Sequence, residues 1–168
     1  MISAPQLLTA NHLLTGFGCG KASLNEWLVK RAMRAQKIGG SARTFVVVNS
    51  INEVVAYYSL STCSINREDA SGKVKRNMPD PIPVILIGRL AVDLKFKNCG
   101  IGTALLKDAL LRVVVAAHEI GVRAVIVHAL DSTAQKFYRY HGFCESPTNE
   151  RTLMITIEEI SRLLDKHQ

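Results

Sequence analysis

Residues 90–106 read LAVDLKFKNCGIGTALL, which predicts the end of a strand, a glycine-rich turn and the start of a helix. The nearly continuous apolar run Val84–Val92 predicts a strand buried on both faces, in which Gly88 marks a bulge or a close approach. Apolar residues then recur at helical spacing and predict a helix over about residues 103–119 with one buried stripe. The stripe consists of Leu106, Leu110, Val113, Ala117 and Ile120.

The turn before this helix has the features of an anion site. A helix N-terminus presents backbone N–H groups without intrahelical acceptors, together with the positive end of the helix dipole. Gly100 and Gly102 remove side chains that would keep a phosphate away. The turn lacks both the Gly-Lys-Ser/Thr ending of a Walker loop and the full dinucleotide-binding fingerprint. A phosphate site and a tight strand-to-helix turn without a ligand therefore both explain the two glycines.

A helix and two strands are predicted upstream of this segment. Helical spacing of apolar residues over 22–37, followed by Gly39-Gly40, predicts one amphipathic helix with a cationic outer face. The β-branched and aromatic segments 44–49 and 54–62 predict two strands joined as a hairpin. Residues 66–83 are polar and proline-rich, and we expect them to form the longest irregular segment of the chain.

The segments after the central helix predict one βαβ unit. The apolar run 124–129 predicts a strand parallel to Val84–Val92, because a helix connects the two strands. Asp131 or Ser132 is expected to cap a second helix that runs through Tyr140, with Gly142 past its end.

The chain is expected to close with a further strand and a short helix. Residues 153–157 predict the strand, and Thr156-x-x-Glu159 predicts a capping box at the start of the helix. The order of elements therefore predicts an α+β (mixed α/β) fold. We expect residues 1–168 to form a single domain, as is typical of this length.

Composition excludes several classes of protein. A hydrophobic fraction of 48% and a charged fraction of 21% are ordinary for a globular protein, and they exclude a disordered chain, collagen-like repeats and a coiled coil. The four cysteines are scattered singly, without C-x-x-C or Cys–His ligand spacing, so no metal site is predicted. We find no secretory signal and no apolar run of membrane-spanning length, which predicts a reduced, soluble, cytoplasmic protein.

The charge is basic, with 21 Lys+Arg against 14 Asp+Glu and a net charge of +7, mostly from the first half of the chain. A cluster of four cations lies in the predicted helix over 22–37. The excess fits an anionic partner and a solvated helix face equally well. The cluster consists of Lys30, Arg31, Arg34 and Lys37.

A second informative segment is Ala134–Phe143, AQKFYRYHGF, which covers most of the helix predicted after residues 124–129 and the residues that follow it. Tyr138 and Tyr140 are two residues apart, so they are expected to point to nearly opposite sides of the helix. One of the two tyrosines is thus expected to be buried and the other exposed. Taken alone, a tyrosine on an amphipathic helix is more often a core residue than a catalytic one.

Together the two segments resemble the GCN5-related N-acetyltransferase (GNAT) family. Lys97-x-x-Gly100-x-Gly102-Thr103-Ala104 is similar to the loop that binds the pyrophosphate of acyl-CoA, although the family usually has Gln or Arg at the first position. The Ala134–Phe143 segment resembles the family's second signature. The resemblance implies a mostly antiparallel central sheet whose parallel strands splay and bind acetyl-CoA, with no metal.

Nearly the whole chain resembles the toxin branch of this family, of the TacT/AtaT type. That resemblance implies a bacterial, cytoplasmic toxin that acetylates the free α-amine of aminoacyl-tRNA and so blocks translation. It also implies a homodimer and a ribbon-helix-helix antitoxin, with DNA bound only through the antitoxin complex. The segments that carry the resemblance are 17–20, 24–28, 31–32, 42–47, 83–84, 88–93 and 153–156.

The resemblance also implies a role for individual residues. Main-chain groups of Ala91 and Val92 are expected to hold the pantetheine arm, an N–H near Val92 to stabilise the oxyanion, and the Tyr138 hydroxyl to protonate the leaving thiolate. Asp131 stands where many relatives carry Asn, and we include it among the cofactor residues. The other expected cofactor residues are Lys97, Asn98, Cys99, Gly100, Ile101, Gly102, Thr103 and Ala104.

No general base is evident from the sequence. An α-amino group titrates near ~8 and a lysine near ~10.4, so an aminoacyl substrate needs a base less than a lysine does. Asp93 or water remain the options for this role. The tRNA is expected to be held through its backbone charge. The residues predicted to contact it are Arg89, Arg76, Lys30, Arg31, Arg34 and Lys37.

Two other functions fit the same sequence. A GNAT enzyme acetylating a small-molecule or protein amine would use the loop and Tyr138 but not the basic first half. A non-enzymatic binding module would keep the fold without the chemistry, and Lys97 and Cys99 leave this alternative open.

Overall fold

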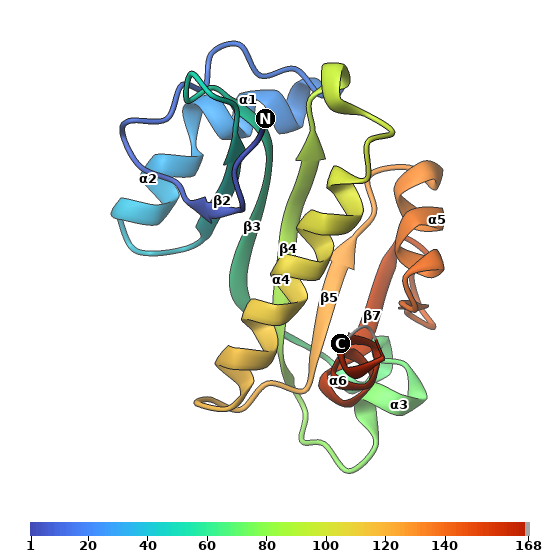
Figure 1. Cartoon of the computed structure of the whole chain (residues 1–168). Helices are drawn as coiled ribbons and strands as arrows, with labels where there is room; N and C mark the ends of the chain where they lie inside the picture. The colour runs from blue at the N-terminus through green and yellow to red at the C-terminus, as the bar shows by residue number, and fades with distance from the viewer. Residues whose placement is uncertain (167–168) are drawn as a thin grey trace. The chain divides into compact units, whose positions relative to one another are not determined.

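The computed structural model describes residues 1–166 of the chain (Figure 1). Seven strands are hydrogen-bonded in the order β1-β2-β3-β4-β5-β7-β6, and β4 and β5 form the parallel pair of a mostly antiparallel mixed α/β fold. The strands are β1 Gln6–Leu7, β2 Arg43–Val48, β3 Val54–Ile65, β4 Ile82–Val92, β5 Ala124–His128, β6 Cys144–Glu145 and β7 Thr152–Thr156. The α-helices are α1 Ala22–Lys30, α2 Ala32–Lys37, α3 Gly72–Lys75, α4 Ile101–Ala117, α5 Ser132–Tyr140 and α6 Ile157–Asp165, and the 3₁₀ helices are η1 Arg67–Asp69 and η2 Leu94–Phe96.

The chain divides into two compact units. Unit 1 comprises Met1–Ser61 and Gly88–Ala109, and unit 2 comprises Thr62–Ile87 and Leu110–Gln168. No helix within residues 1–166 has both the length and the apolar character that crossing a membrane requires. The expectation of a single GNAT domain over 1–168 stays a prediction.

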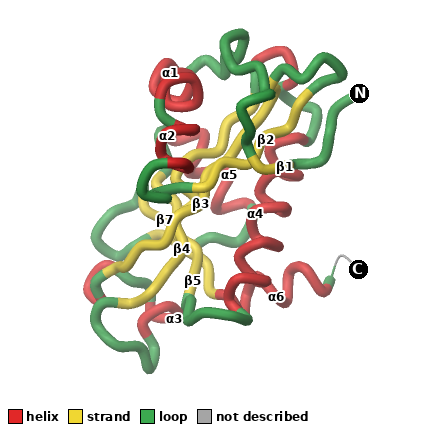
Figure 2. Tube along the Cα trace, turned by 90° about the vertical axis from the view of Figure 1, so that its left-hand side faces the viewer, coloured by secondary structure: helices red, strands yellow, loops and turns green. Residues whose placement is uncertain are grey.

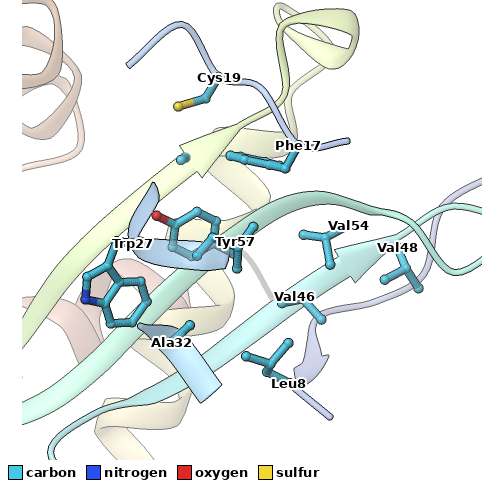
Figure 3. Packing of buried hydrophobic residues seen from close by; sticks show 11 residues of the cluster. Leu8, Phe17, Cys19, Trp27, Ala32, Val46, Val48, Val54 and Tyr57 are labelled. Atoms are coloured by element: carbon cyan, nitrogen blue, oxygen red, sulfur yellow. The ribbon is translucent and has the colours of Figure 1, made fainter. Parts of the chain in front are cut away.

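Unit 1 is built on the hairpin predicted from the sequence. β2 and β3 pair antiparallel, with Val46 opposite Tyr57, and β1 adds to the outer side of β2 (Figure 2). Asn52 in the connecting turn has a φ of 68°, a left-handed conformation that asparagine tolerates better than most residues. The core packs the rings of Trp27 and Tyr57 in a stack, with Phe17 edge-on to Tyr57 (Figure 3).

The prediction of one helix over 22–37 is wrong, because Arg31 leaves the helical conformation with a φ of −125° and separates α1 from α2. The break gives the two helices separate contacts: α1 buries Trp27, while α2 buries Gln36. The Gln36 amide donates to the Leu8 carbonyl at 2.8 Å and accepts from the Thr44 N–H at 3.0 Å. This bridge between distant backbone segments has no signature in the helical periodicity.

Unit 2 contains the predicted parallel pair. β4 and β5 are in register from Val84 opposite Ala124 to Ile87 opposite Val127, and β7 pairs antiparallel with β5 on its other side. β4 begins at Ile82, two residues before the predicted start. The segment expected to be irregular contains η1 and α3, and Val74 of α3 is buried in the core of the unit.

Helices α5 and α6 begin as predicted. The Asp131 carboxylate accepts from the Ala134 N–H at 2.9 Å, and the Thr156 and Glu159 side chains form the capping box of α6. Gly142 follows α5 with a φ of 96°.

α4 starts and ends two residues earlier than predicted. Ile120 therefore lies beyond the helix and is 52% exposed, so its assignment to the buried stripe is wrong. Leu106, Leu110 and Val113 of the same stripe are buried as expected.

Candidate active site

The glycine-rich loop of unit 1 follows a turn that Asp93 holds. The Asp93 carboxylate accepts from the Lys95 N–H at 2.9 Å and from the Gly18 N–H at 3.0 Å, and its own N–H donates to the Val55 carbonyl at 2.8 Å. The residue is 7% exposed. Its carboxylate is therefore already bonded to two backbone N–H groups that stabilise the turn, which argues against Asp93 as the general base. β4 ends just before it with Ala91, which is buried in the core of unit 1, and Val92, which is half-buried.

The loop itself is exposed from Lys97 to Gly100. Asn98 and Gly100 have φ values of 62° and 80°, so the chain passes twice through the left-handed region. A Cβ on Gly100 would meet no atom within 4 Å among the contacts described for it, so the glycine is required by its backbone conformation and not by packing. The space above the turn is thus open, as a bound phosphate would need. The exposed Cys99 contacts only the Lys97 carbonyl in the loop, with its Sγ 3.5 Å from that oxygen.

The first turn of α4 leaves backbone N–H groups for an anion. Ala104 donates to the Gly100 carbonyl at 3.1 Å, which closes the first turn of the helix. The N–H groups of Gly100, Ile101 and Gly102 precede that bond along the chain, and the first turn contains no acidic residue. The assignment of the N–H groups from Gly100 to Ala104 to a phosphate stays a prediction.

Tyr138 lies in unit 2 on α5 and is 7% exposed, whereas Tyr140 is 86% exposed. The prediction that the two tyrosines point in opposite directions is confirmed. The Tyr138 ring packs against Phe137 and Phe143, with centroids 5.3 and 5.4 Å away. Desolvation by burial raises the pKa of Tyr138 above its ordinary value, so the phenol stays protonated throughout the neutral range. Asp131 also lies in unit 2, and its carboxylate caps α5, so a role in cofactor binding stays a prediction.

Most of the cations predicted to contact tRNA belong to unit 1. Lys30, Arg31, Arg34 and Lys37 are exposed on α1, on α2 or between them. Arg89 is half-buried, and its guanidinium carbon lies 4.2 Å from the centre of the Trp27 ring, as in a cation–π contact. The pKa of Arg89 is lowered by desolvation, opposed by Tyr57, and lowered further by nearby Arg31. The remaining residue of the set, Arg76, is exposed in unit 2.

Two features of these surroundings were missed from the sequence. The first is the stack of Arg89, Trp27 and Tyr57, which joins β4, α1 and β3. No local sequence motif indicates it. Lys73, Arg123 and Arg162 gather around Arg76 in unit 2, and their only sequence signal is their charge. Within residues 1–166, no group of three or more His, Cys, Asp or Glu residues is arranged to hold a metal ion.

Comparison with protein families places the site in a known context. The model described as "Acetyltransferase (GNAT) domain" matches residues 40–145, which include β4, the glycine-rich loop and α5.

Individual relatives match over nearly the full length. The chain is 43% identical over 162 residues to the "tRNA-acetylating toxin" of Mycobacterium tuberculosis (strain ATCC 25618 / H37Rv), with 96% of each chain covered. AtaT complexed with acetyl-methionyl-tRNAfMet has a TM-score of 0.89 at 26% identity, covering 98% of this chain and 99% of that one. A tyrosine-to-phenylalanine mutant of KacT also has a TM-score of 0.89, at 25% identity, covering 96% and 98%. The chain therefore belongs to the GNAT family of acetyltransferases.

Proposed function

We propose that this protein transfers an acetyl group from acetyl-CoA to the α-amine of aminoacyl-tRNA and acts as a toxin by blocking translation. The observation that carries this proposal is the 43% identity to a tRNA-acetylating toxin over 96% of both chains. The likeness to AtaT in complex with an acetylated aminoacyl-tRNA supports it. A structure of AtaT and its antitoxin with acetyl-CoA, at 28% identity, supports acetyl-CoA as the acetyl donor.

The glycine-rich loop is the proposed pyrophosphate site. The N–H groups of Gly100, Ile101, Gly102 and Thr103 converge at the positive end of α4, where a doubly charged pyrophosphate is stabilised. The exposed Lys97 adds a charge beside them, and Asn98 and Cys99 complete the rim of the loop. Main-chain groups of Ala91 and Val92, at the end of β4, hold the pantetheine arm by strand-like pairing.

The reaction is a direct displacement at the thioester. The amine nitrogen attacks the acetyl carbonyl carbon, a C–N bond forms, and the C–S bond breaks. A main-chain N–H near Val92 stabilises the negative charge that develops on the carbonyl oxygen. The sulfur leaves as a thiolate and takes up one proton, while the amine nitrogen gives one up.

Tyr138 supplies the proton to the thiolate. Burial keeps its phenol protonated, so a donor is present whenever the thiolate leaves. A water-excluded environment raises the pKa of the leaving thiol as well, so the pKa values of the thiol and the phenol rise together and proton transfer between them remains favourable. Solved structures of tyrosine-to-phenylalanine mutants of KacT and AtaT support the choice of a tyrosine as the residue to test in this branch of the family.

The amine needs no side-chain base. An α-amino group titrates near ~8 in peptides, and the neighbouring ester of aminoacyl-tRNA lowers its pKa further, so much of it is neutral at pH 7. The Asp93 carboxylate is already bonded to two backbone N–H groups, which supports water as the acceptor of the amine proton.

The tRNA is held mainly through its phosphates. Arg89 lies two residues before Ala91 on β4, and we assign it the contact nearest to the reacting end. The exposed cations of α1 and α2, together with Arg76, contact the backbone farther from that end.

The protein acts in the bacterial cytoplasm as a homodimer and is neutralised by a ribbon-helix-helix antitoxin. Solved structures of AtaT with the C-terminus of its antitoxin AtaR and of the AtaT–AtaR complex bound to DNA support an antitoxin partner that carries the DNA contact.

The test is transfer of radiolabelled acetyl from acetyl-CoA to a pool of aminoacylated tRNA. We expect Tyr138→Phe to lower the rate by about 10²-fold or more, as for loss of a general acid. The matched control is Tyr140→Phe, which removes a hydroxyl from the same helix at an 86% exposed position and should leave the rate unchanged. If label appeared only in free amino acids or lysine peptides offered in the same assay, those amines and not aminoacyl-tRNA would be the substrate.

A further inference from the structure

Unit 2 contains a small basic pocket, of which the proposed function uses only Arg76. Its volume is about 190 Å³. Three segments form it: the end of α3, the residue before β5 and the first turns of α6. The charged residues that line it are Lys73, Arg76, Arg123, Arg162, Glu158 and Glu159, so it carries two more positive than negative charges.

Arg123 builds one wall of the pocket. Its Nε donates to the Val74 carbonyl at 3.0 Å, and its Nη2 donates to the Lys73 carbonyl at 2.8 Å. A cation bonded to the last carbonyls of a helix is in the favourable position for the helix dipole. Arg123 therefore fixes the end of α3, and with it the position of Arg76, the residue that caps this end.

The carboxylates of the pocket already have partners in unit 2. Glu159 belongs to the α6 capping box and lies 3.5 Å from Lys73 Nζ, and Glu158 lies 3.7 Å from Arg162. The guanidinium of Arg76 has no ion pair or hydrogen bond among residues 1–166. The surplus charge thus lies on Arg76 and on Arg123, which is bonded to backbone carbonyls, while Arg162, whose side chain is 72% exposed, shares its charge with Glu158.

The size and chemistry of the pocket suit a single phosphate group. Pockets for drug-sized ligands span about 300–1,000 Å³, so this one is too small for a whole nucleotide. Planar guanidinium groups bind phosphate oxygens with two parallel hydrogen bonds, which favours arginine pairs at phosphate sites.

The pocket lies at the opposite end of β5 from the start of α5. Arg123 immediately precedes Ala124, whereas Asp131 caps α5 just after the strand has ended. Five residues of strand span roughly 13 Å at about 3.3 Å per residue. A ligand that reacts near α5 and also reaches this pocket must be extended and must carry anionic groups along its length, as an RNA backbone does.

We propose that this pocket binds a backbone phosphate of the RNA substrate, at a distance from the reacting amine. The inference rests on the proposed function, because it takes aminoacyl-tRNA as that substrate. It assigns Arg76 and Arg162 to direct phosphate contact and makes Arg123 the residue that positions Arg76.

The experiment compares the double variant Arg76→Gln/Arg162→Gln with the wild type. The affinity of the full chain for aminoacyl-tRNA is measured between about 50 and 200 mM salt, together with the KM and kcat for acetyl transfer. We expect about tenfold weaker tRNA binding, a higher KM with kcat retained, and a slope of log affinity against log salt that is smaller by about 2. Acetyl-CoA affinity should not change.

The matched control is Lys107→Gln/Lys166→Gln, which removes the same charge from two exposed positions outside the pocket. An equal loss in the control would show a general charge effect and overturn the proposal. So would an unchanged salt slope in the pocket variant while the wild type still acetylates tRNA, and in that case the proposed function stands. A wild type that neither binds nor acetylates aminoacyl-tRNA overturns both.

Two further outcomes are decisive. If the pocket variant loses affinity for the antitoxin and keeps it for tRNA, the pocket is a protein-docking site and the RNA assignment is wrong. If the double variant melts well below the wild type, the single variant Arg76→Gln takes its place. That variant removes an exposed group without a described partner, and a loss of about 1 in the salt slope is then expected.

Discussion

Helix α6 begins with a side-chain cap, whereas α4 begins with two glycines and no acidic residue in its first turn. In α6, Thr156 and Glu159 satisfy each other's backbone N–H groups, and Glu158 adds a second negative charge near the positive end of the dipole. In α4, the first turn follows an exposed loop in which Gly100 has a left-handed backbone conformation.

Under the proposed function, the difference separates a helix start that stabilises the fold from one that binds the cofactor. A helix N-terminus favours an anion, and α6 and α5 supply that anion from their own side chains, Glu159 and Asp131. α4 leaves the position for a phosphate. The capping residue that would stabilise α4 in isolation would compete with acetyl-CoA for the same N–H groups.

The largest effect is expected when the first turn of α4 is given an acidic side chain of its own, as in α6. Thr103→Glu places a carboxylate at the third helical position, where Glu159 stands in α6. We expect acetyl-CoA affinity to fall about 10- to 100-fold, because a hydrogen bond to a charged group contributes about 1.5–3 kcal/mol and the new charge repels pyrophosphate. Calorimetric titration with acetyl-CoA measures it. Thr103→Gln is the neutral control, and equal losses in both variants would contradict the electrostatic explanation.

Opening the start of α5 should affect stability alone. Asp131→Ala removes the acceptor of the Ala134 N–H, and we expect the free energy of unfolding to drop by about 1 kcal/mol in denaturant titrations. Asp131→Asn keeps the cap and should restore most of this loss. Weaker acetyl-CoA binding by the alanine variant, measured where it is fully folded and restored by asparagine, would instead assign Asp131 to the cofactor.

The same change at α6 sharpens the contrast with α4. Thr156→Ala breaks the capping box and should also lower the free energy of unfolding by about 1 kcal/mol. Acetyl-CoA affinity, measured at a temperature where the variant is fully folded, should match the wild type. A reduced affinity would mean that the two helix starts are not functionally separate.

The smallest effect is expected at the side chain beside the open helix start. Lys97 is exposed, and exposed charge pairs contribute about 0.2–1 kcal/mol, so Lys97→Gln should weaken acetyl-CoA binding only about two- to fivefold. The loss should vanish at high salt. Lys97→Arg, which offers two parallel hydrogen bonds to phosphate, should bind at least as tightly as the wild type. A loss as large as that of Thr103→Glu would shift the main phosphate contact from the backbone to the side chain.

Much of the candidate site was predictable because its signals are local. The cap of α5, the capping box of α6 and the opposite orientations of Tyr138 and Tyr140 each depend on residues within four positions of one another. The left-handed turn at Gly100 is likewise a property of one residue's backbone. Such features follow from helix geometry alone, whatever the rest of the chain does.

The sequence by itself thus determined the β2–β3 hairpin, the parallel β4–β5 pair, helices α4 to α6 with the caps of α5 and α6, and the loop at the start of α4. Only the tertiary structure decided that the Asp93 carboxylate accepts a hydrogen bond from the Gly18 N–H, 75 residues away. The same is true of the bond from Arg123 to the Val74 carbonyl of α3, which joins residues 49 positions apart. The tertiary structure also placed Arg89 over Trp27 and broke the first helix at Arg31. These features depend on which side chains meet across the packed core, and the helix and strand periods of the sequence contain no information about such distant partners.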